Sequence, residues 1–219
     1  MRPQRVETSV SPVPLGGAPA QSLSDEEVVR RVLAGEPALY EVIMRRHVQR
    51  LFRTLRATIA DDREAEDATR ETYVKAFASL REFDGRGRFS TWLLRIAIQE
   101  ALERGRQAAH PPTLARDHAN GTIAMPGMLE RAIEGLPATL RTVYVLRDVD
   151  GLATDETADC LGISHVNVRV RLHRARTQLK AHADPQVVTD VRQLHPFPED
   201  RCDRVVAGVM SRIKNRAEA

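Results

Sequence analysis

Apolar residues recur every three to four positions along most of the chain, which predicts helices rather than strands. Aromatic residues make up only 4% of the 219 residues, so the cores must be built mainly from Leu, Val, Ile and Ala. That composition favours helices over sheets. One predicted helix covers residues 37–60 and the next covers residues 62–81. We therefore expect an all-α fold.

Changes in composition divide this all-α chain into two small helical domains. Residues 1–23 are rich in Pro, Gly, Ser and Ala and are predicted to be a disordered tail. The first domain covers residues 24–106. Prolines and glycines without a sustained period predict a flexible linker over residues 107–126. The second domain covers residues 127–183, and residues 184–219 form a short helical C-terminal extension.

Polar residues with capping side chains mark several predicted helix starts. Ser24 with Glu27 three positions later matches a capping box. Ser90, Thr154 and Ser164 are expected to cap the helices that follow them. A short helix, a turn at Gly162 and a longer helix then predict a helix-turn-helix in the second domain.

The stretch GISHVNVRVRLHRARTQLK, residues 162–180, combines an apolar stripe with positive charge and contains no acidic residue. Its predicted buried stripe consists of Val168, Leu172, Ala175 and Leu179. The second helix of a helix-turn-helix enters the major groove of DNA, and its N-terminal residues face the base edges. The candidate DNA contacts are Ser164, His165, Asn167, Arg169, Arg171, Arg174 and Arg176. The alternative is a solvated helix whose arginines pair with carboxylates from elsewhere in the fold.

Residues 26–181, with motifs in both domains, resemble the extracytoplasmic-function group of bacterial sigma factors. In the second domain the resemblance rests on Leu136-Pro137, Leu146-Arg147, the segment around Gly151 and Leu161, and the run RLHRAR. In the first domain it rests on AEDATRETYVKAF and FDGRGRFSTWLLRIA. The resemblance implies a dissociable subunit of RNA polymerase whose second domain reads the −35 promoter element. The first domain would bind polymerase, recognise the −10 element and help to open it.

Carried over position by position, the resemblance implies two sets of site residues in the first domain. The polymerase-binding set is Glu66, Asp67, Arg70, Glu71 and Lys75. The −10 set is Phe83, Asp84, Arg86, Arg88, Phe89, Ser90, Arg95 and Gln99. Glycines in the loop allow close approach of the backbone, and arginines can meet phosphate or stack on an unstacked base.

Three positions depart from the family pattern. Gln99 stands where Asn is common, which leaves the details of −10 recognition open. Asn167 stands where Thr is usual and Val170 where Ser or Thr is usual. The promoter sequence therefore cannot be copied from a better-known relative. Trp92 is expected in the core.

Other classes of protein are disfavoured by the residues present. The acidic cluster between Asp61 and Asp67 has no histidine with it, so we expect no enzyme active site. Cys202 with His195 and His110 lacks a metal-ligand spacing, and Cys160 is expected to be a small core residue. We expect no cofactor and no metal. No apolar run is long enough to cross a bilayer and the start does not match a secretory signal, so we expect a cytoplasmic protein.

The expected partners are core RNA polymerase and promoter DNA, with an anti-sigma factor as a further candidate. Two alternatives stay open at this point. One is a helix-turn-helix regulator that binds DNA without polymerase. The other is an interaction protein that has lost promoter opening and sequesters polymerase or a regulator, an alternative suggested by Gln99. The extension beyond Asp184 is expected to pack on one of the domains and modulate binding, or to dock another protein.

Overall fold

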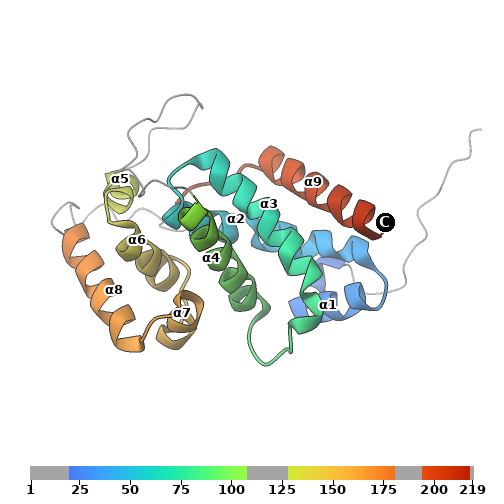
Figure 1. Cartoon of the computed structure of the whole chain (residues 1–219), viewed down its shortest axis with the longest axis horizontal. Helices are drawn as coiled ribbons and strands as arrows, with labels where there is room; N and C mark the ends of the chain where they lie inside the picture. Colours follow the sequence, from blue (N-terminus) through green and yellow to red (C-terminus); the bar gives the residue numbers. More distant parts are fainter. Residues whose placement is uncertain (1–19, 108–127, 181–193, 218–219) are drawn as a thin grey trace, which may run out of the picture.

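The structure is a computed structural model that describes residues 20–107, 128–180 and 194–217. Every regular element in these ranges is helical, which confirms the all-α prediction (Figure 1). The predicted linker, apart from the helical Gln107, and most of the predicted tail lie outside the described residues. Ala20–Ser22 nevertheless form a short 3-10 turn, so ordered structure begins before the predicted Ser24. Arg46 holds this segment against the first domain by donating to the main-chain carbonyls of Gln21 and Leu23.

Four helices and two short 3-10 turns form the first domain. The elements are α1 (Asp25–Leu33), a turn at Pro37–Leu39, α2 (Tyr40–Thr58), α3 (Asp62–Ala78), a turn at Leu80–Glu82 and α4 (Phe89–Gln107). Their apolar faces meet in one core, in which Tyr40 and Tyr73 are fully buried. Each of these two hydroxyls donates to a backbone carbonyl of the opposite helix, at 2.9 and 3.0 Å. Burial of the two tyrosines therefore leaves no unsatisfied hydroxyl.

The predicted helix starts in the first domain are partly confirmed. Ser24 caps α1, because its Oγ accepts from the Glu27 amide at 3.2 Å. The expectation for Ser90 is wrong, since α4 begins one residue earlier at Phe89. Phe89 is buried, so its ring fixes the first turn and places Ser90 inside the helix. Asp61, which the sequence analysis did not single out, caps α3 by accepting from the Glu64 amide at 2.8 Å.

The second domain is a helix-turn-helix supported by three further elements. It contains α5 (Met128–Glu134), α6 (Ala138–Tyr144), a π-helical segment (Val145–Val149), α7 (Thr154–Leu161) and α8 (His165–Lys180). Gly162 ends α7 with φ +62°, a conformation that favours glycine, and Ser164 caps α8 as predicted. The expectation that Thr154 caps α7 is wrong. The capping position is Ala153, whose amide donates to the Glu156 carboxylate at 2.8 Å.

The two domains share apolar surface rather than touching only through a linker. Leu146, Leu152 and Cys160 of the second domain belong to the core of the first domain. In return, Ala57 of α2 is part of the second domain's core. Helix α7 lies against α4, and α6 lies against the C-terminal half of α2 (Figure 1). Burial of Cys160 confirms its expected core position.

A buried carboxylate ties the turn after the π-helical segment to α2. The Asp150 side chain is 1% exposed and lies 3.2 Å from Arg53 Nη2. Its Oδ2 accepts from the Thr54 hydroxyl at 3.1 Å, and its main-chain carbonyl accepts from Arg50 at 3.1 Å. Burial raises the pKa of the Asp150 carboxyl, and Arg53 and Arg50 oppose that shift. The charge of this carboxylate therefore depends on the arginines of the other domain.

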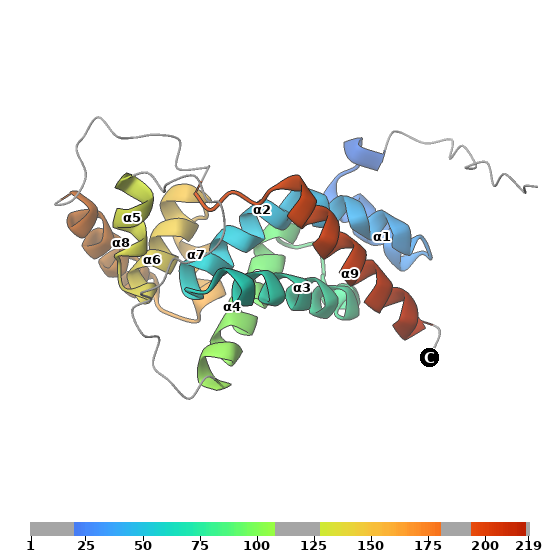
Figure 2. The same ribbon diagram turned by 90° about the horizontal axis from the view of Figure 1, so that it is seen from above.

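The C-terminal extension crosses from the second domain to the first. Leu194 lies in the core of the second domain, and Phe197 lies in the core of the first. Between them the side-chain amide of Gln49 donates to the His195 carbonyl at 2.9 Å and accepts from the Phe197 amide at 2.6 Å. The last helix, α9 (Glu199–Ala217), then runs along α3 and α2 (Figure 2). Hereafter, residues 194–197 are called the strap.

Removing the buried carboxylate is expected to weaken both the fold and the contact between domains. Asp150→Ala leaves the guanidinium of Arg53 buried without this acidic partner, and we expect a loss of about 3 kcal/mol in unfolding free energy. Urea denaturation of the full chain measures the change. Asp159→Ala is the matched control, because Asp159 also faces the other domain, 3.8 Å from Arg95, but both side chains are exposed. That control should cost less than about 1 kcal/mol. Equal losses for the two variants would contradict this role of Asp150.

The strap is expected to make stability depend on pH through His195. Burial, followed by the nearby Arg56, Arg141 and Arg53, lowers the pKa of His195 to about 3. The carboxylate of Glu134 is 3.9 Å from its Nδ1, too distant to offset these cations. Below pH 6.5, the ordinary pKa of histidine, His195 becomes protonated in the unfolded chain but stays neutral in the folded chain. The contribution of neutral His195 to the free energy of unfolding is therefore fully present above pH 6.5 and is lost as the pH falls towards 3.

The expected extra slope between pH 6 and 4 is about 1 kcal/mol per pH unit. His195→Asn removes the titration and keeps a residue that tolerates the left-handed backbone at this position, where φ is +50°. Unfolding free energies of both proteins, measured across this range, give the slopes. Parallel curves would show that His195 is not protected from protonation in the folded state.

Candidate nucleic-acid and protein interfaces

Helix α8 has the buried stripe that its sequence predicts and an outer face available to a ligand. Val168, Leu172, Ala175 and Leu179 are all buried. The stripe seats α8 on α6 and α7, at the end of the molecule remote from α9 (Figure 1). Exposed along the other side are Ser164, His165, Asn167, Arg169, Arg174 and Arg176, with Arg171 half-buried. The arrangement leaves the N-terminal half of the helix open, as insertion in a groove requires.

The arginines of α8 differ in their internal partners. Arg176 donates through Nε and Nη2 to the two carboxylate oxygens of Asp148, at 2.8 and 2.7 Å. For this residue the alternative expectation of an acidic partner from elsewhere in the fold is confirmed. Arg169, Arg171 and Arg174 form no ion pair with any carboxylate in the part of the chain that the structure describes. These three guanidinium groups are therefore the best placed to neutralise phosphate.

The loop before α4 is held by an aromatic cluster. The ring of Phe83 packs edge-on against Phe89, with centroids 5.3 Å apart, and Trp92 lies 5.4 Å from Phe89. Phe89 is 1% exposed, so its ring supports the loop from inside. Phe83 and Trp92 are half-buried and complete the cluster, which agrees with the core position expected for Trp92. The loop is therefore seated on the core at its two ends.

The middle of the loop projects into solvent. Gly85 has φ +73°, and the Asp84 carboxylate accepts from the Arg86 amide at 3.0 Å, which shapes the turn. The Arg86 side chain is 90% exposed, and Arg88 is also exposed. The long side chains of Arg86 and Arg88 extend from a loop whose ends are fixed, so their guanidinium groups can reach phosphate or the face of an unstacked nucleotide base.

A shallow cleft of about 330 Å³ lies between α3 and α4, next to this loop. Its lining includes Lys75, Trp92, Arg95, Gln99 and Glu100. Gln99 and Arg95 are exposed at its rim, so both predicted −10 residues on α4 are accessible. On the neighbouring turn of α4, the Thr91 hydroxyl donates to Glu156 of α7 at 3.0 Å. The second domain therefore sits beside the predicted −10 surface.

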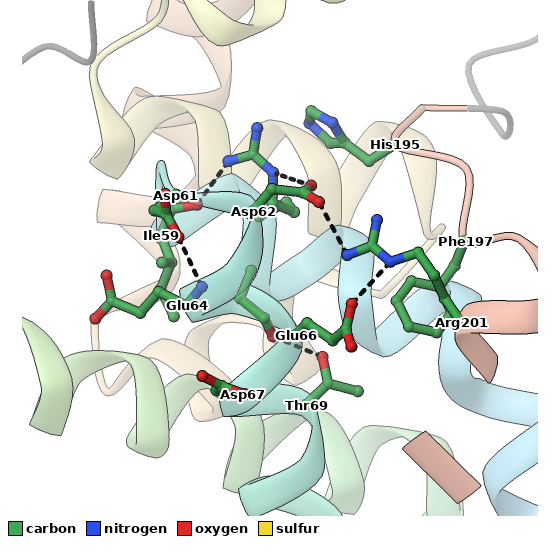
Figure 3. Close-up of polar contacts among 12 residues, drawn as sticks. Ile59, Asp61, Asp62, Glu64, Glu66, Asp67, Thr69, His195, Phe197 and Arg201 are labelled. Carbon is green, nitrogen blue, oxygen red and sulfur yellow. Dashed lines mark hydrogen bonds and ion pairs between the residues drawn. The ribbon is translucent and has the colours of Figure 1, made fainter. Parts of the chain in front are cut away.

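The five predicted polymerase-binding residues lie on α3, and each has an intramolecular ion pair. Arg70 pairs with both Glu66 and Asp67. Lys75 lies 2.7 Å from Glu100 and from Glu103 of α4. Glu66 and Glu71 pair with two arginines of α9, Arg201 and Arg212. Figure 3 shows Arg201 reaching Glu66 and Asp62 together.

The acidic residues at the start of α3 form caps and ion pairs. Asp61 caps the helix, and Asp62 lies between Arg56 and Arg201 (Figure 3). Within residues 20–107, 128–180 and 194–217, no three His, Cys, Asp or Glu side chains converge as metal ligands. His110 lies outside these ranges, while Cys202 is buried on α9. Over the same ranges, no helix is long and apolar enough to span a bilayer.

Comparison with known protein families assigns both domains. Residues 43–110 match the model of Sigma-70 region 2, and residues 127–179 match the model of Sigma-70, region 4. The chain belongs to the sigma-70 family. The two matches follow the order expected from the sequence and cover more than half of the chain. Region 2 contains α3, the loop and the α4 surface, whereas region 4 contains the helix-turn-helix.

The curated relatives of the chain include sigma factors of the extracytoplasmic-function group. The chain is 28% identical over 182 residues to RNA polymerase sigma-H factor of Pseudomonas aeruginosa, covering 74% of this chain and 94% of the relative. It is 27% identical over 187 residues to the ECF RNA polymerase sigma-E factor of Haemophilus influenzae, covering 76% and 98%. ECF RNA polymerase sigma factor SigM of Mycobacterium tuberculosis is 29% identical over 180 residues, covering 77% and 92%.

A solved structure supports the same fold. CnrH, determined in complex with the cytosolic domain of CnrY, superposes with a TM-score of 0.51 at 24% identity. The superposition covers 70% of this chain and 93% of CnrH. The likeness extends the family assignment to the three-dimensional arrangement of helices, which is the two-domain all-α fold.

Several features of these surfaces were missed by sequence reasoning. The pairing of α9 with α3 joins residues far apart in the chain, so the spacing of residues within either helix does not predict it. A partial signal existed nonetheless, because Arg201 and Arg212 are eleven positions apart and Asp62 and Glu66 are four positions apart. Residues at these intervals lie near one side of a helix, so two complementary charged edges were present in the sequence.

Proposed function

We propose that this chain is an alternative sigma factor that binds core RNA polymerase and directs it to a small set of promoters. The observation that carries the proposal is the presence of sigma-70 regions 2 and 4, in that order, on two domains of one chain. A regulator that bound DNA alone would need region 4 but not region 2. The chain would act in the cytoplasm by binding, and no covalent chemistry is assigned to its own residues.

The geometry supports a division of labour between three surfaces. On α3, the polymerase-binding surface comprises Glu66, Asp67, Arg70, Glu71 and Lys75, because mixed charge on a half-buried helix suits a reversible and specific contact. The exposed loop cations Arg86 and Arg88 and the rim residues Arg95 and Gln99 would contact the −10 element. Phe83 and Phe89 hold that loop in place.

The third surface is the exposed side of α8, which would read the −35 element as duplex. Asn167 and Arg169 lie near its N-terminus, and both side-chain types can make two hydrogen bonds to one base. Arg171 and Arg174 would contact phosphate. Arg176 contributes less directly, since Asp148 already holds its guanidinium group. An anti-sigma factor remains a predicted further partner.

A second candidate function is sequestration of polymerase without promoter opening. It is favoured by Gln99, whose amide lies one methylene farther from the backbone than that of the usual Asn. The domain packing also favours it, because Thr91 and Arg95 of α4 contact α7. Both functions require polymerase binding, so transcription itself separates them.

Run-off transcription with sigma-free core polymerase and fragments of the host genome tests the proposal. We expect discrete new transcripts that fall about tenfold or more when Arg169 and Arg171 are both changed to Ala, because each lost contact to a base or phosphate weakens binding. Thr177→Ala is the matched control, an exposed position near the other end of α8 that should leave transcription unchanged.

The other outcomes of this assay are equally informative. Stable binding to core polymerase without any transcript would favour the sequestering protein. Transcripts unaffected by the double substitution would remove α8 from promoter recognition. No binding to core polymerase would overturn the sigma assignment and leave the stand-alone DNA regulator.

A further inference from the structure

The C-terminal helix occupies part of the α3 surface that polymerase is proposed to use, because it contacts Glu66 and Glu71. Helix α9 packs obliquely across α3 and also touches α2 (Figure 2). Val205, Val206, Val209 and Ile213 are 0 to 7% exposed and join the core of the first domain. Met210 packs against this face half-buried. The apolar face of α9 is therefore covered within the same chain.

Charged groups align the two helices. Arg201 Nε lies 2.8 Å from Glu66, and its Nη2 lies 2.9 Å from Asp62 (Figure 3). One turn farther along α3, Arg212 lies 2.9 Å from Glu71. Two of the five predicted polymerase-binding side chains are thus neutralised by α9. A partner that binds this face must replace those arginines with cations or polar groups of its own.

Aromatic rings hold Arg201 from the other side. Its guanidinium carbon lies 4.7 Å from the ring centre of Phe52 and 4.8 Å from that of Phe197. The two rings pack against each other with centroids 4.6 Å apart. Figure 3 shows Arg201 beside Phe197, between the strap and α3. The cation–π contacts add to the ion pairs and give α9 a fixed register on α3.

The strap links this cover to the arrangement of the domains. Leu194 is buried among residues of the second domain, and Phe197 is buried in the first. His195 lies between α2, α5 and α6, close to Arg56, Glu134 and Arg141. A segment anchored at both ends resists any movement that separates the domains.

We propose that residues 194–217 are a built-in clamp that competes with core polymerase for the α3 face and holds the two domains closed. This inference rests on the proposed sigma function. The occupant of the face is thus a segment of the chain itself, and polymerase is the partner that must displace it. The free chain would be largely unable to bind polymerase until α9 is released.

Promoter geometry also requires the domains to open. The −10 and −35 elements are about 25 base pairs apart, or about 85 Å at 3.4 Å per base pair. Packed helices lie only about 10 Å apart, and α7 is packed on α4 beside the proposed −10 surface. The closed arrangement cannot place α8 and α4 on both elements together. Holding the domains closed would therefore block promoter recognition as well as docking.

The outer ion pairs of α9, unlike the mostly buried pair of Arg201 with Glu66, suit release rather than permanent burial. The Arg212 and Glu71 side chains are 54 and 30% exposed, and Arg45 and Asp203 at the edge are 42 and 57% exposed. Exposed ion pairs contribute little to stability and exchange partners readily. The apolar contact of α9 is limited to one stripe of side chains, so a partner that buries a comparable apolar area on α3 can displace the helix.

The test measures affinity for core polymerase with α9 released. Val209→Asp places a charge at a position that is 0% exposed, without changing any residue of α3. Ala207→Asp adds the same charge to an exposed position of the same helix. If one tenth of the free chain is open, we expect Val209→Asp to lower the apparent Kd for core polymerase about tenfold, and Ala207→Asp to leave it unchanged. Fluorescence anisotropy of labelled full-length chain gives both values.

A second variant separates release of α9 from loss of folding. Arg201→Gln combined with Arg212→Gln removes the ion pairs without burying a charge, and circular dichroism confirms the helical content of every variant. We expect this double variant to bind more tightly than the wild type as well. Equal Kd values for wild type and all folded variants would overturn the clamp while leaving the sigma function intact. No polymerase binding by any variant would overturn both.

Discussion

The structure depends on one helix that has no free side over its C-terminal half. Every residue of α2 from Leu51 to Ala57 is buried, including the cations Arg53 and Arg56. A helix covered all round must lie inside a fold, and buried cations require acceptors. Asp150 meets Arg53, while Glu134 and the carbonyls of Ile59 and Ala60 meet Arg56. The second domain is thus drawn onto the first by charge as much as by apolar surface.

This constraint explains which parts of the fold were predictable from sequence. The stripe of α8 was predicted residue by residue, because a helix with one buried face reveals that face through its period. A helix was also predicted over residues 37–60, but the burial of Arg53 and Arg56 was not predicted. Only tertiary contacts bury them. The starts of α4 and α7 were misplaced for a related reason, since Phe89 and Glu156 fix those turns through packing and a side-chain bond rather than through Ser90 or Thr154.

The candidate surfaces show the same division. The residue types and spacing of α8 and of the glycine-arginine loop indicated nucleic-acid contacts, and family resemblance added the α3 set. Sequence could not reveal that Arg176 is held by Asp148, because the pair joins two helices of the domain. It also could not reveal that Glu66 and Glu71 face Arg201 and Arg212. Those contacts turn a plain C-terminal extension into a candidate competitor for the docking face, and they link polymerase binding to opening of the domains.

Hydrogen exchange on the full-length chain, free and bound to core polymerase, tests this account most directly. In the free chain, amides of α3 and α9 should both be protected, because each covers the other. On binding polymerase, residues 62–78 should stay protected while residues 199–217 exchange faster. That result would show that polymerase has taken the place of α9. Unchanged protection of residues 199–217 in a stable complex would contradict the account.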